Sequence, residues 1–213
     1  MAGSQRAETW RTKDGRDWRI GSAEEVRWIQ ETPVGKSVAD AIPPVFEAYA
    51  TLEQPLSGDR LTKWEAAHDR QTVVVDAWER HEAALLEILV GRTRPQAWWL
   101  GYLETGNSDV VFPDAPRVEM YAHWSYVLVQ AGPDQAAKWR TNDVWGESLP
   151  DVMFPVDHSW LVTTLWDDDW TCIGGSRALI DSVLADPALL ERAREVDPSM
   201  SMAEACPPGH EYF

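Results

Sequence analysis

The first part of the chain alternates apolar and polar positions and then changes to helical spacing. Residues 9–21 alternate around an Asp-Gly pair, which favours tight hairpin turns, so we predict a small β-hairpin there. A helix should follow, because Ser22 and Glu25 have the spacing of a capping box and apolar positions recur behind them. The sequence thus predicts a hairpin followed directly by a helix over about 22–32.

Two further helices are predicted before residue 92. Proline is tolerated in the first turn of a helix and little elsewhere, so the Pro43-Pro44 step predicts a helix that begins near Pro44. The longest helical pattern runs from residue 61 to residue 90 and ends at Gly91. A β-branched run at 72–75 leaves open a division of this segment into two helices. The helix that begins near Pro44 would have Val45, Phe46, Tyr49 and Leu52 on its apolar side.

After Pro95 the pattern becomes typical of strands joined by short turns. We predict a strand at 97–105, a turn at 106–109, a strand at 110–112 and two strands within 117–132, folded about residues 123–125. A short helix at 133–140 and a long loop with prolines at 142–158 should follow. The segments 159–166 and 170–175 then predict a second hairpin.

The last part of the chain predicts two helices and a tail. Ser176 and Asp186 are good helix N-caps for segments 176–185 and 186–196. Residues 197–213 contain a Pro-Pro-Gly step and are predicted to form a mobile tail. Helices, then strands, then helices indicate an α+β fold. We therefore expect a single domain over 1–196, with a mainly antiparallel sheet of about five to seven strands covered by helices on one side.

The composition narrows the class of protein. A chain of 213 residues suits one domain with a sizeable core. Thirteen tryptophans against four phenylalanines are unusual, and tryptophan favours layered cores and pocket walls because its indole N–H needs a partner. The charged first residues exclude a signal peptide, and no apolar stretch has the length of a membrane helix. Two cysteines are too few for a disulfide framework, so we expect a cytoplasmic protein with reduced thiols.

Negative charge is the strongest guide to a partner. The chain has a net charge of −16, and residues 141–176 contain seven acidic and no basic side chains. A field of this sign repels phosphate backbones and anionic lipid, so neither nucleic acid nor a membrane is an expected partner. A basic protein, a cation or a neutral ligand would not be repelled. Solubility alone would also account for the charge.

Three consecutive aspartates, Asp167–Asp169, lie between Trp166 and Trp170 in the second predicted hairpin. Aspartate suits turns because its side chain bonds to nearby backbone N–H groups, and the two tryptophans would then face each other across the strands. A calcium loop would need the spacing D-x-D-x-D-G, which is absent. We predict that the three aspartates form an exposed turn. The alternative is that their acidic surface contacts a partner.

No motif in the sequence names a reaction. The five histidines lack metal-ligand spacing, and neither a G-x-S-x-G nor a C-x-x-C motif occurs, so no metal, cofactor or catalytic residue is predicted. Aromatic side chains on the predicted strands, with Glu104 and Asp109 beside them, would suit a flat or cationic ligand, or equally fill a core. The candidate binding residues are Asp167, Asp168, Asp169, Trp166, Trp170, Glu104, Asp109, Trp99 and Trp124.

Two sets of residues carry a resemblance to known families. The segments IPPVFEAYATLE (42–53), WWLGYLETGNSDVVFPDAPRVEMYAHWSYVLVQAGPDQAAKW (98–139) and MFPVDHSWLVTTLWDDDWTCIGG (153–175) resemble an uncharacterised, tryptophan-rich family of actinobacterial proteins, which implies no function. The step Ile42-Pro43 followed by Phe46 is similar to the SUKH superfamily of toxin-immunity proteins. That resemblance implies a protein partner of toxin type. The long helix at 61–90 has no clear counterpart in that superfamily.

Three functions are compatible with these features. The first is an acidic binding protein of immunity or regulatory type that engages a basic protein. The second is a small-molecule enzyme or binder with a tryptophan-lined pocket, in which Glu104, Asp109 or Asp168 would act as acid–base groups. The third is a structural protein without a site. The absence of a catalytic motif favours a binding protein over an enzyme, and the position of the tryptophans should separate a pocket from a core.

Overall fold

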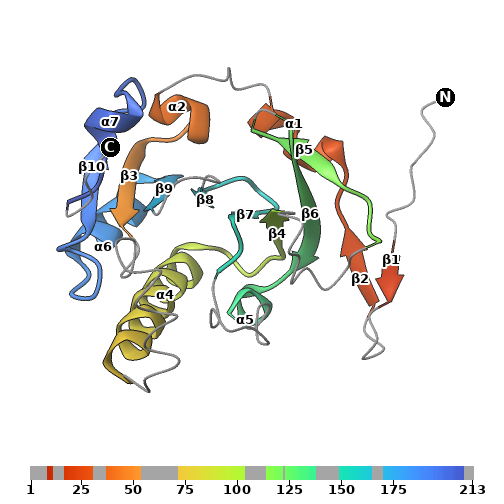
Figure 1. Cartoon of the computed structure of the whole chain (residues 1–213), viewed down its shortest axis with the longest axis horizontal. Coiled ribbons are helices and arrows are strands. Elements are labelled where there is room, and N and C mark those ends of the chain that lie inside the picture. The colour runs from red at the N-terminus through yellow and green to blue at the C-terminus, as the bar shows by residue number, and fades with distance from the viewer. Residues whose placement is uncertain are drawn as a thin grey trace.

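The fold is built on one antiparallel sheet with helices on both of its faces (Figure 1). The α+β class is confirmed, but the sheet has ten described strands rather than five to seven. Every strand pair in it is antiparallel. The computed structural model describes residues 9–11, 17–30, 37–53, 72–103, 114–121, 123–137, 149–164 and 170–208.

The strand order across the sheet is β1-β2-β6-β4-β7-β8-β9-β3-β10, and β5 pairs with β6 beside this path. The first and last strands of the chain, β1 and β10, therefore form the two edges of the sheet. Strand β3 lies between β9 and β10, among strands from the C-terminal half of the chain. The strands are β1 (Thr9–Arg11), β2 (Asp17–Ile20), β3 (Ala48–Glu53), β4 (Trp98–Leu103), β5 (Val118–Met120), β6 (Trp124–Ala131), β7 (Val152–Pro155), β8 (Leu161–Thr164), β9 (Trp170–Gly175) and β10 (Ala193–Val196).

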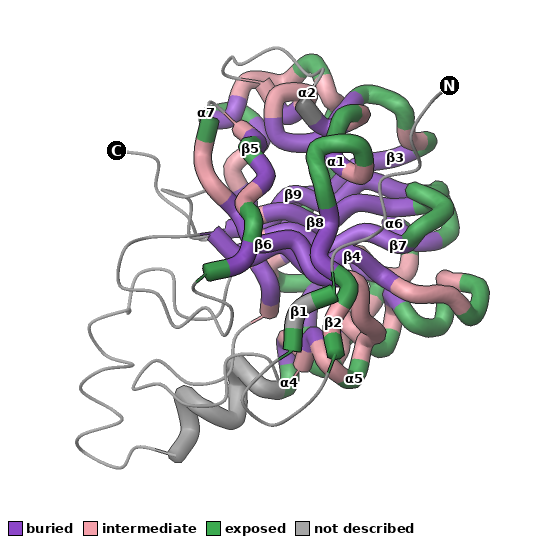
Figure 2. The backbone as a smooth tube through the Cα atoms, turned by 90° about the vertical axis from the view of Figure 1, so that its right-hand side faces the viewer, coloured by how far each residue is buried: buried purple, intermediate pink, exposed green. Residues whose placement is uncertain are grey.

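The helices form two layers, one on each face of the sheet. Figure 1 shows α1, α2 and α7 above the strands and α4 and α5 below them, and Figure 2 shows the same layers from the side. Helix α6 contacts α4, β3, β9 and β10 and so belongs to the lower layer. The described helices are α1 (Ala23–Gln30), α2 (Val38–Ala41), α4 (Thr72–Arg92), α5 (Pro133–Ala136), α6 (Arg177–Ala185) and α7 (Met202–Ala205).

Two hydrophobic cores result, one under each helical layer. Leu89 of α4 and Ile180 of α6 belong to the lower core, whereas Val26 of α1 and Met202 of α7 belong to the upper one. Strands β3, β4 and β9 are buried at every position (Figure 2). The expectation of helices on one side only is therefore wrong, and burial on both faces explains the continuous apolar runs of these strands.

The segment after the two prolines is a strand and not the predicted helix. The chain turns there, with Val45 N donating to Pro43 O at 2.8 Å, and β3 begins at Ala48. Leu52 faces the lower core and Tyr49 the upper one. Apolar residues on both sides of a strand give no clear period of two, so their spacing also fits a helix.

Two other strands form where the sequence predicted a loop and a helix. The predicted loop at 142–158 contains β7, which ends at Pro155 beside β4 and β8. The predicted helix at 186–196 is a turn followed by β10. Asp186 does cap this turn, because its Oδ1 accepts the N–H of Ala188 at 2.8 Å, but the following residues extend along β3. Tertiary pairing with β3 overrides the helical pattern here.

Local predictions hold where they rest on turn and cap chemistry. The hairpin β1–β2 and the hairpin β8–β9 both form, and β5 and β6 pair about the predicted turn. Helices α5 and α6 and strand β4 also occur where expected. Helix α4 covers 72–92 and so continues past Gly91, while the predicted elements at 61–71 and 106–112 lie outside the described residues.

The segment assigned to a mobile tail packs on the domain as far as residue 208. Met202 and Ala205 of α7 are buried in the upper core. The hydroxyl of Thr51 on β3 donates to Ala205 O at 2.6 Å. Residues 197–208 therefore help to cover the upper face of the sheet.

Candidate functional site

The sheet brings most of the predicted site segments to one end. Strands β4 and β8 are both antiparallel to β7, so Leu103 and Thr164 at their last positions lie at the same end, called the loop end below. Trp124 and Trp170 begin strands β6 and β9 at this end. Six of the candidate residues are outside the described residues: Glu104, Asp109, Trp166, Asp167, Asp168 and Asp169.

The described tryptophans of the strands lie mainly in the cores. Trp170 is 1% exposed and pairs with Glu53 of β3, and Trp99 is 3% exposed. Trp98 and Trp160 pack edge to face in the lower core, with ring centroids 4.8 Å apart. Trp124 is half-buried. These side chains fill the cores on the two sides of the sheet. The sequence left open whether they would line a pocket or fill a core.

Two tyrosines and an aspartate lie in the upper layer at the loop end. The Asp151 carboxylate accepts the backbone N–H of Leu103 at 2.8 Å. Tyr121 has a positive φ of 45° and its hydroxyl donates to Ala41 O at 3.1 Å, while its ring meets Tyr126 edge to face. Burial raises the pKa of both tyrosines. Their hydroxyls thus stay protonated at neutral pH.

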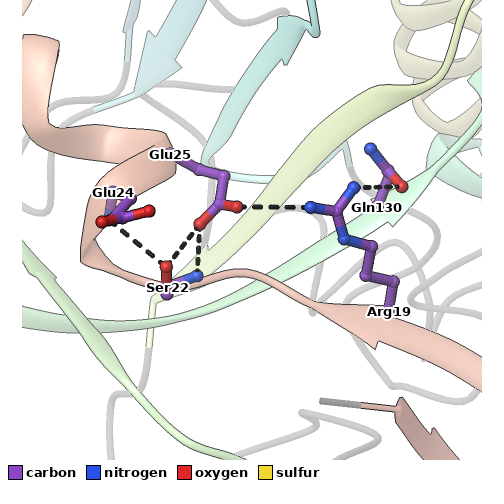
Figure 3. Close-up of polar contacts among 5 residues, drawn as sticks. All are labelled: Arg19, Ser22, Glu24, Glu25 and Gln130. Atoms are coloured by element: carbon purple, nitrogen blue, oxygen red, sulfur yellow. Dashed lines mark hydrogen bonds and ion pairs between the residues drawn. The ribbon is translucent and has the colours of Figure 1, made fainter. Parts of the chain in front are cut away.

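Trp99, at the opposite end of β4, is covered by an arginine. The Arg19 guanidinium lies 5.1 Å from the centre of the Trp99 ring, a cation–π distance. Figure 3 shows Arg19 held between Gln130 Oε1, at 3.1 Å, and Glu25 Oε1, at 3.5 Å. Glu25 also accepts the backbone N–H of Ser22 at 2.7 Å, which is the acidic half of the predicted capping box, whereas the Ser22 hydroxyl accepts the N–H of Glu24 at 3.3 Å. One side of the Trp99 ring is therefore covered by Arg19 of the same chain.

On the same face as Trp99, three aromatic rings from separate segments form a group in which Trp28 and Phe46 are half-buried and His158 is exposed. The rings of Trp28 and His158 stack, with centroids 4.6 Å apart and planes 20° from parallel. Phe46 meets Trp28 edge to face at 6.2 Å. Val45 precedes Phe46 in the chain and Val156 lies in the same turn as His158, and the two valines are 70% and 46% exposed. We call these five residues the aromatic strip.

Hydrogen bonds fix both turns that carry the strip. In the first turn, Phe46 N donates to the Tyr49 hydroxyl at 2.9 Å, and that hydroxyl donates to Pro43 O at 3.3 Å. In the second turn, His158 N donates to Pro155 O at 2.9 Å, although His158 has a positive φ of 55°. The exposed valines are therefore held in place before any partner arrives.

The exposed carboxylates near and beyond the strip are ionised at neutral pH. Hydrogen bonds from Gln96 and Ser159 hold the pKa of Asp157 below its usual range against the opposing effect of partial burial. Hydrogen bonds from serine neighbours lower the pKa of Asp197 and Glu204 in the same way. His158 is different, because burial against the aromatic rings lowers its pKa and favours the neutral imidazole.

The sequence did not reveal the strip, because its members come from three segments that only the fold brings together. The one local signal is a valine directly after each of Pro44 and Pro155, on an exposed turn. The described part of the chain contains no group of three or more His, Cys, Asp or Glu suited to a metal ion. Cys172 is buried on β9, as predicted, and it forms no disulfide with Cys206.

None of the described helices has the length and apolar character needed to cross a membrane. Comparisons with protein-family models, with curated proteins and with solved structures found no match for this chain.

Proposed function

We propose that this chain is an acidic binding protein of immunity or regulatory type that engages a basic protein. The observation that carries the proposal is the state of the acidic groups. Their neighbours lower the pKa of four described carboxyl groups: Asp17, Asp157, Asp197 and Glu204. Carboxyl groups are ionised at neutral pH, so the excess of 35 acidic over 19 basic side chains gives the chain a net charge of −16 and a lasting negative field. Such a field speeds association with a positively charged partner.

The position of the tryptophans supports a binding surface over an acid–base enzyme. Trp98, Trp99, Trp160 and Trp170 are each at most 3% exposed, so they pack the sheet rather than line an open site. A reduced cytoplasmic setting, with two cysteines that form no disulfide, fits the same proposal.

A small-molecule site at the loop end is the second candidate, and one observation favours it. The Tyr126 hydroxyl is buried and has no hydrogen-bond partner among the described residues. Such a group costs stability unless a ligand satisfies it. If it is only buried, Tyr126→Phe should raise the free energy of unfolding by about 1 kcal/mol. If it binds a ligand, the substitution should instead abolish the thermal stabilisation that the ligand gives.

The proposed function is tested by capture from native lysate at two salt concentrations. We expect the captured proteins to be basic and to be released as the Debye length falls below about 8 Å. The matched variant replaces Asp167, Asp168 and Asp169 by asparagine, which removes three charges but keeps turn-forming residues. Capture of neutral or acidic proteins, insensitive to salt, would remove the proposal.

A further inference from the structure

We propose that the aromatic strip is the docking surface for an arginine-bearing segment of the basic partner. This inference rests on the proposed function and assigns it a place on the molecule. The strip combines Val45, Phe46, Trp28, His158 and Val156 on the upper face of the sheet.

The first argument is exposed apolar surface on rigid turns. Val45 is 70% exposed and Val156 46%, and each belongs to a turn closed by the hydrogen bonds described above. A surface that is already ordered loses little conformational entropy on binding. The other large exposed apolar residues, Val90 on α4 and Leu190 after α6, lie on the opposite side of the sheet and provide controls.

The second argument is the chemistry of the rings. Trp28 and His158 form a stacked pair whose outer member, His158, is exposed. A guanidinium is planar and weakly hydrated, so it stacks on such rings better than an ammonium group does. The protein already makes this contact once on the same face, where Arg19 covers Trp99. Phe154, which is fully buried, packs edge to face under Trp28 at 5.5 Å and holds the platform.

The third argument is charge at the two ends of the strip. Glu47 follows Phe46 in the chain and Asp157 precedes His158, and both are exposed. Each of these carboxylates already has an arginine near it: Glu47 accepts the backbone N–H of Arg177 at 2.9 Å and interacts with its charge, and the charge of Arg94 acts on Asp157. Arg27 pairs with Glu24 at 3.9 Å, and Arg177 pairs with Glu195 at 2.5 Å. A positively charged segment laid along the strip would therefore meet apolar surface in the middle and a carboxylate at each end.

The test uses the full-length, isotope-labelled protein and three short peptides as probes. The first is acetyl-Gly-Arg-Ala-Arg-Gly amide, and the others replace both arginines by lysine or by uncharged citrulline. We expect the arginine peptide to shift the NMR signals of the Trp28 indole and the His158 ring. Its affinity should exceed that of the lysine peptide by about two- to fivefold, the range of an exposed cation–π contact.

Val156→Lys and Val90→Lys form a matched pair of variants. The two valines are equally exposed, at 46%, and both substitutions add one positive charge. We expect Val156→Lys to weaken binding of the arginine peptide about fivefold more than Val90→Lys, and Val45→Lys to act like Val156→Lys. Thermal melts should show that all three variants fold, because each site is exposed.

The outcomes separate this inference from the proposed function. Equal weakening by Val156→Lys and Val90→Lys, or peptide binding that leaves the Trp28 and His158 signals unmoved, would overturn the strip as the docking surface. So would an arginine peptide that does not bind. In each of these cases a basic, salt-sensitive partner captured from lysate would still support the proposed function.

Discussion

At the scale of single residues, several acidic side chains of this chain also form hydrogen bonds with backbone N–H groups. Aspartates and glutamates close turns and helix starts by accepting N–H groups from the chain beside them. Negative charge for a partner and local order thus come from the same side chains. At three places with the spacing Ser-x-x-acid, the acid accepts the backbone N–H of the serine: Glu25 from Ser22, Asp40 from Ser37, and Glu204 from Ser201.

The cap of α6 provides a direct stability test. Ser176 Oγ accepts the N–H of Leu179 at 3.2 Å, and the helix packs into the lower core. Ser176→Ala removes this acceptor and should lower the free energy of unfolding by about 1 kcal/mol in urea denaturation. Ser176→Asp keeps an acceptor and should leave the stability near that of the parent chain. An unchanged midpoint for Ser176→Ala would show that the bond contributes nothing.

His81 should make the fold sensitive to acid. It is 5% exposed, and its Nδ1 has no partner among the described residues. Burial, with a smaller effect of Arg192, lowers its pKa to about 4 from the ordinary 6.5. The unfolded chain therefore binds a proton more readily than the folded one between these values. Stability should fall as the pH drops from about 6.5 to about 4, by up to about 3 kcal/mol.

Urea denaturation at several pH values checks this expectation. His81→Leu removes the titrating group and should flatten the loss of stability between pH 6.5 and 4. His158→Gln is the control, since His158 is exposed and its lowered pKa should add only a small part of the effect. A pH profile that His81→Leu leaves unchanged would assign the acid sensitivity to other groups.

At the scale of elements, local chemistry allowed the hairpins and helix caps to be predicted, whereas three of the strands were not predicted. An Asp-Gly pair or a serine before a helix acts on its neighbours, so β1–β2 and α1 appear directly in the sequence. Strands β3, β7 and β10 depend on partners distant along the chain, and no local rule reports those partners. The aromatic strip was missed for the same reason, because Trp28, Phe46 and His158 meet only after folding.

Gly174 tests the contact between β9 and the turn that carries part of the strip. A Cβ atom at this position would lie 2.5 Å from Phe46 and 2.7 Å from Ile42, which is fully buried. Gly174→Ala should therefore lower the free energy of unfolding by about 1–3 kcal/mol through overpacking. Gly175→Ala is the neighbouring control, because its nearest atom would be 3.3 Å away. Similar urea midpoints for the two variants would contradict this close packing.

At the scale of the whole molecule, charge and stability should be separable. The net charge of −16 acts over many ångströms, whereas the two cores hold the sheet by short-range packing. Replacing Asp167, Asp168 and Asp169 by asparagine should leave the melting temperature nearly unchanged and slow association with a basic partner. Thermal melts and association rates at two salt concentrations measure both effects. A large loss of stability would show that the three carboxylates are needed for folding.

The position of β3 has a consequence for the order in which the molecule can assemble. Its residues, 48–53, leave the ribosome early, yet both of its neighbours, β9 and β10, begin only at residues 170 and 193. During most of synthesis β3 therefore has two open edges, and an unpaired strand of apolar residues is prone to pair with other chains. The upper and lower cores around β3 can close only when the last fifth of the chain has been made.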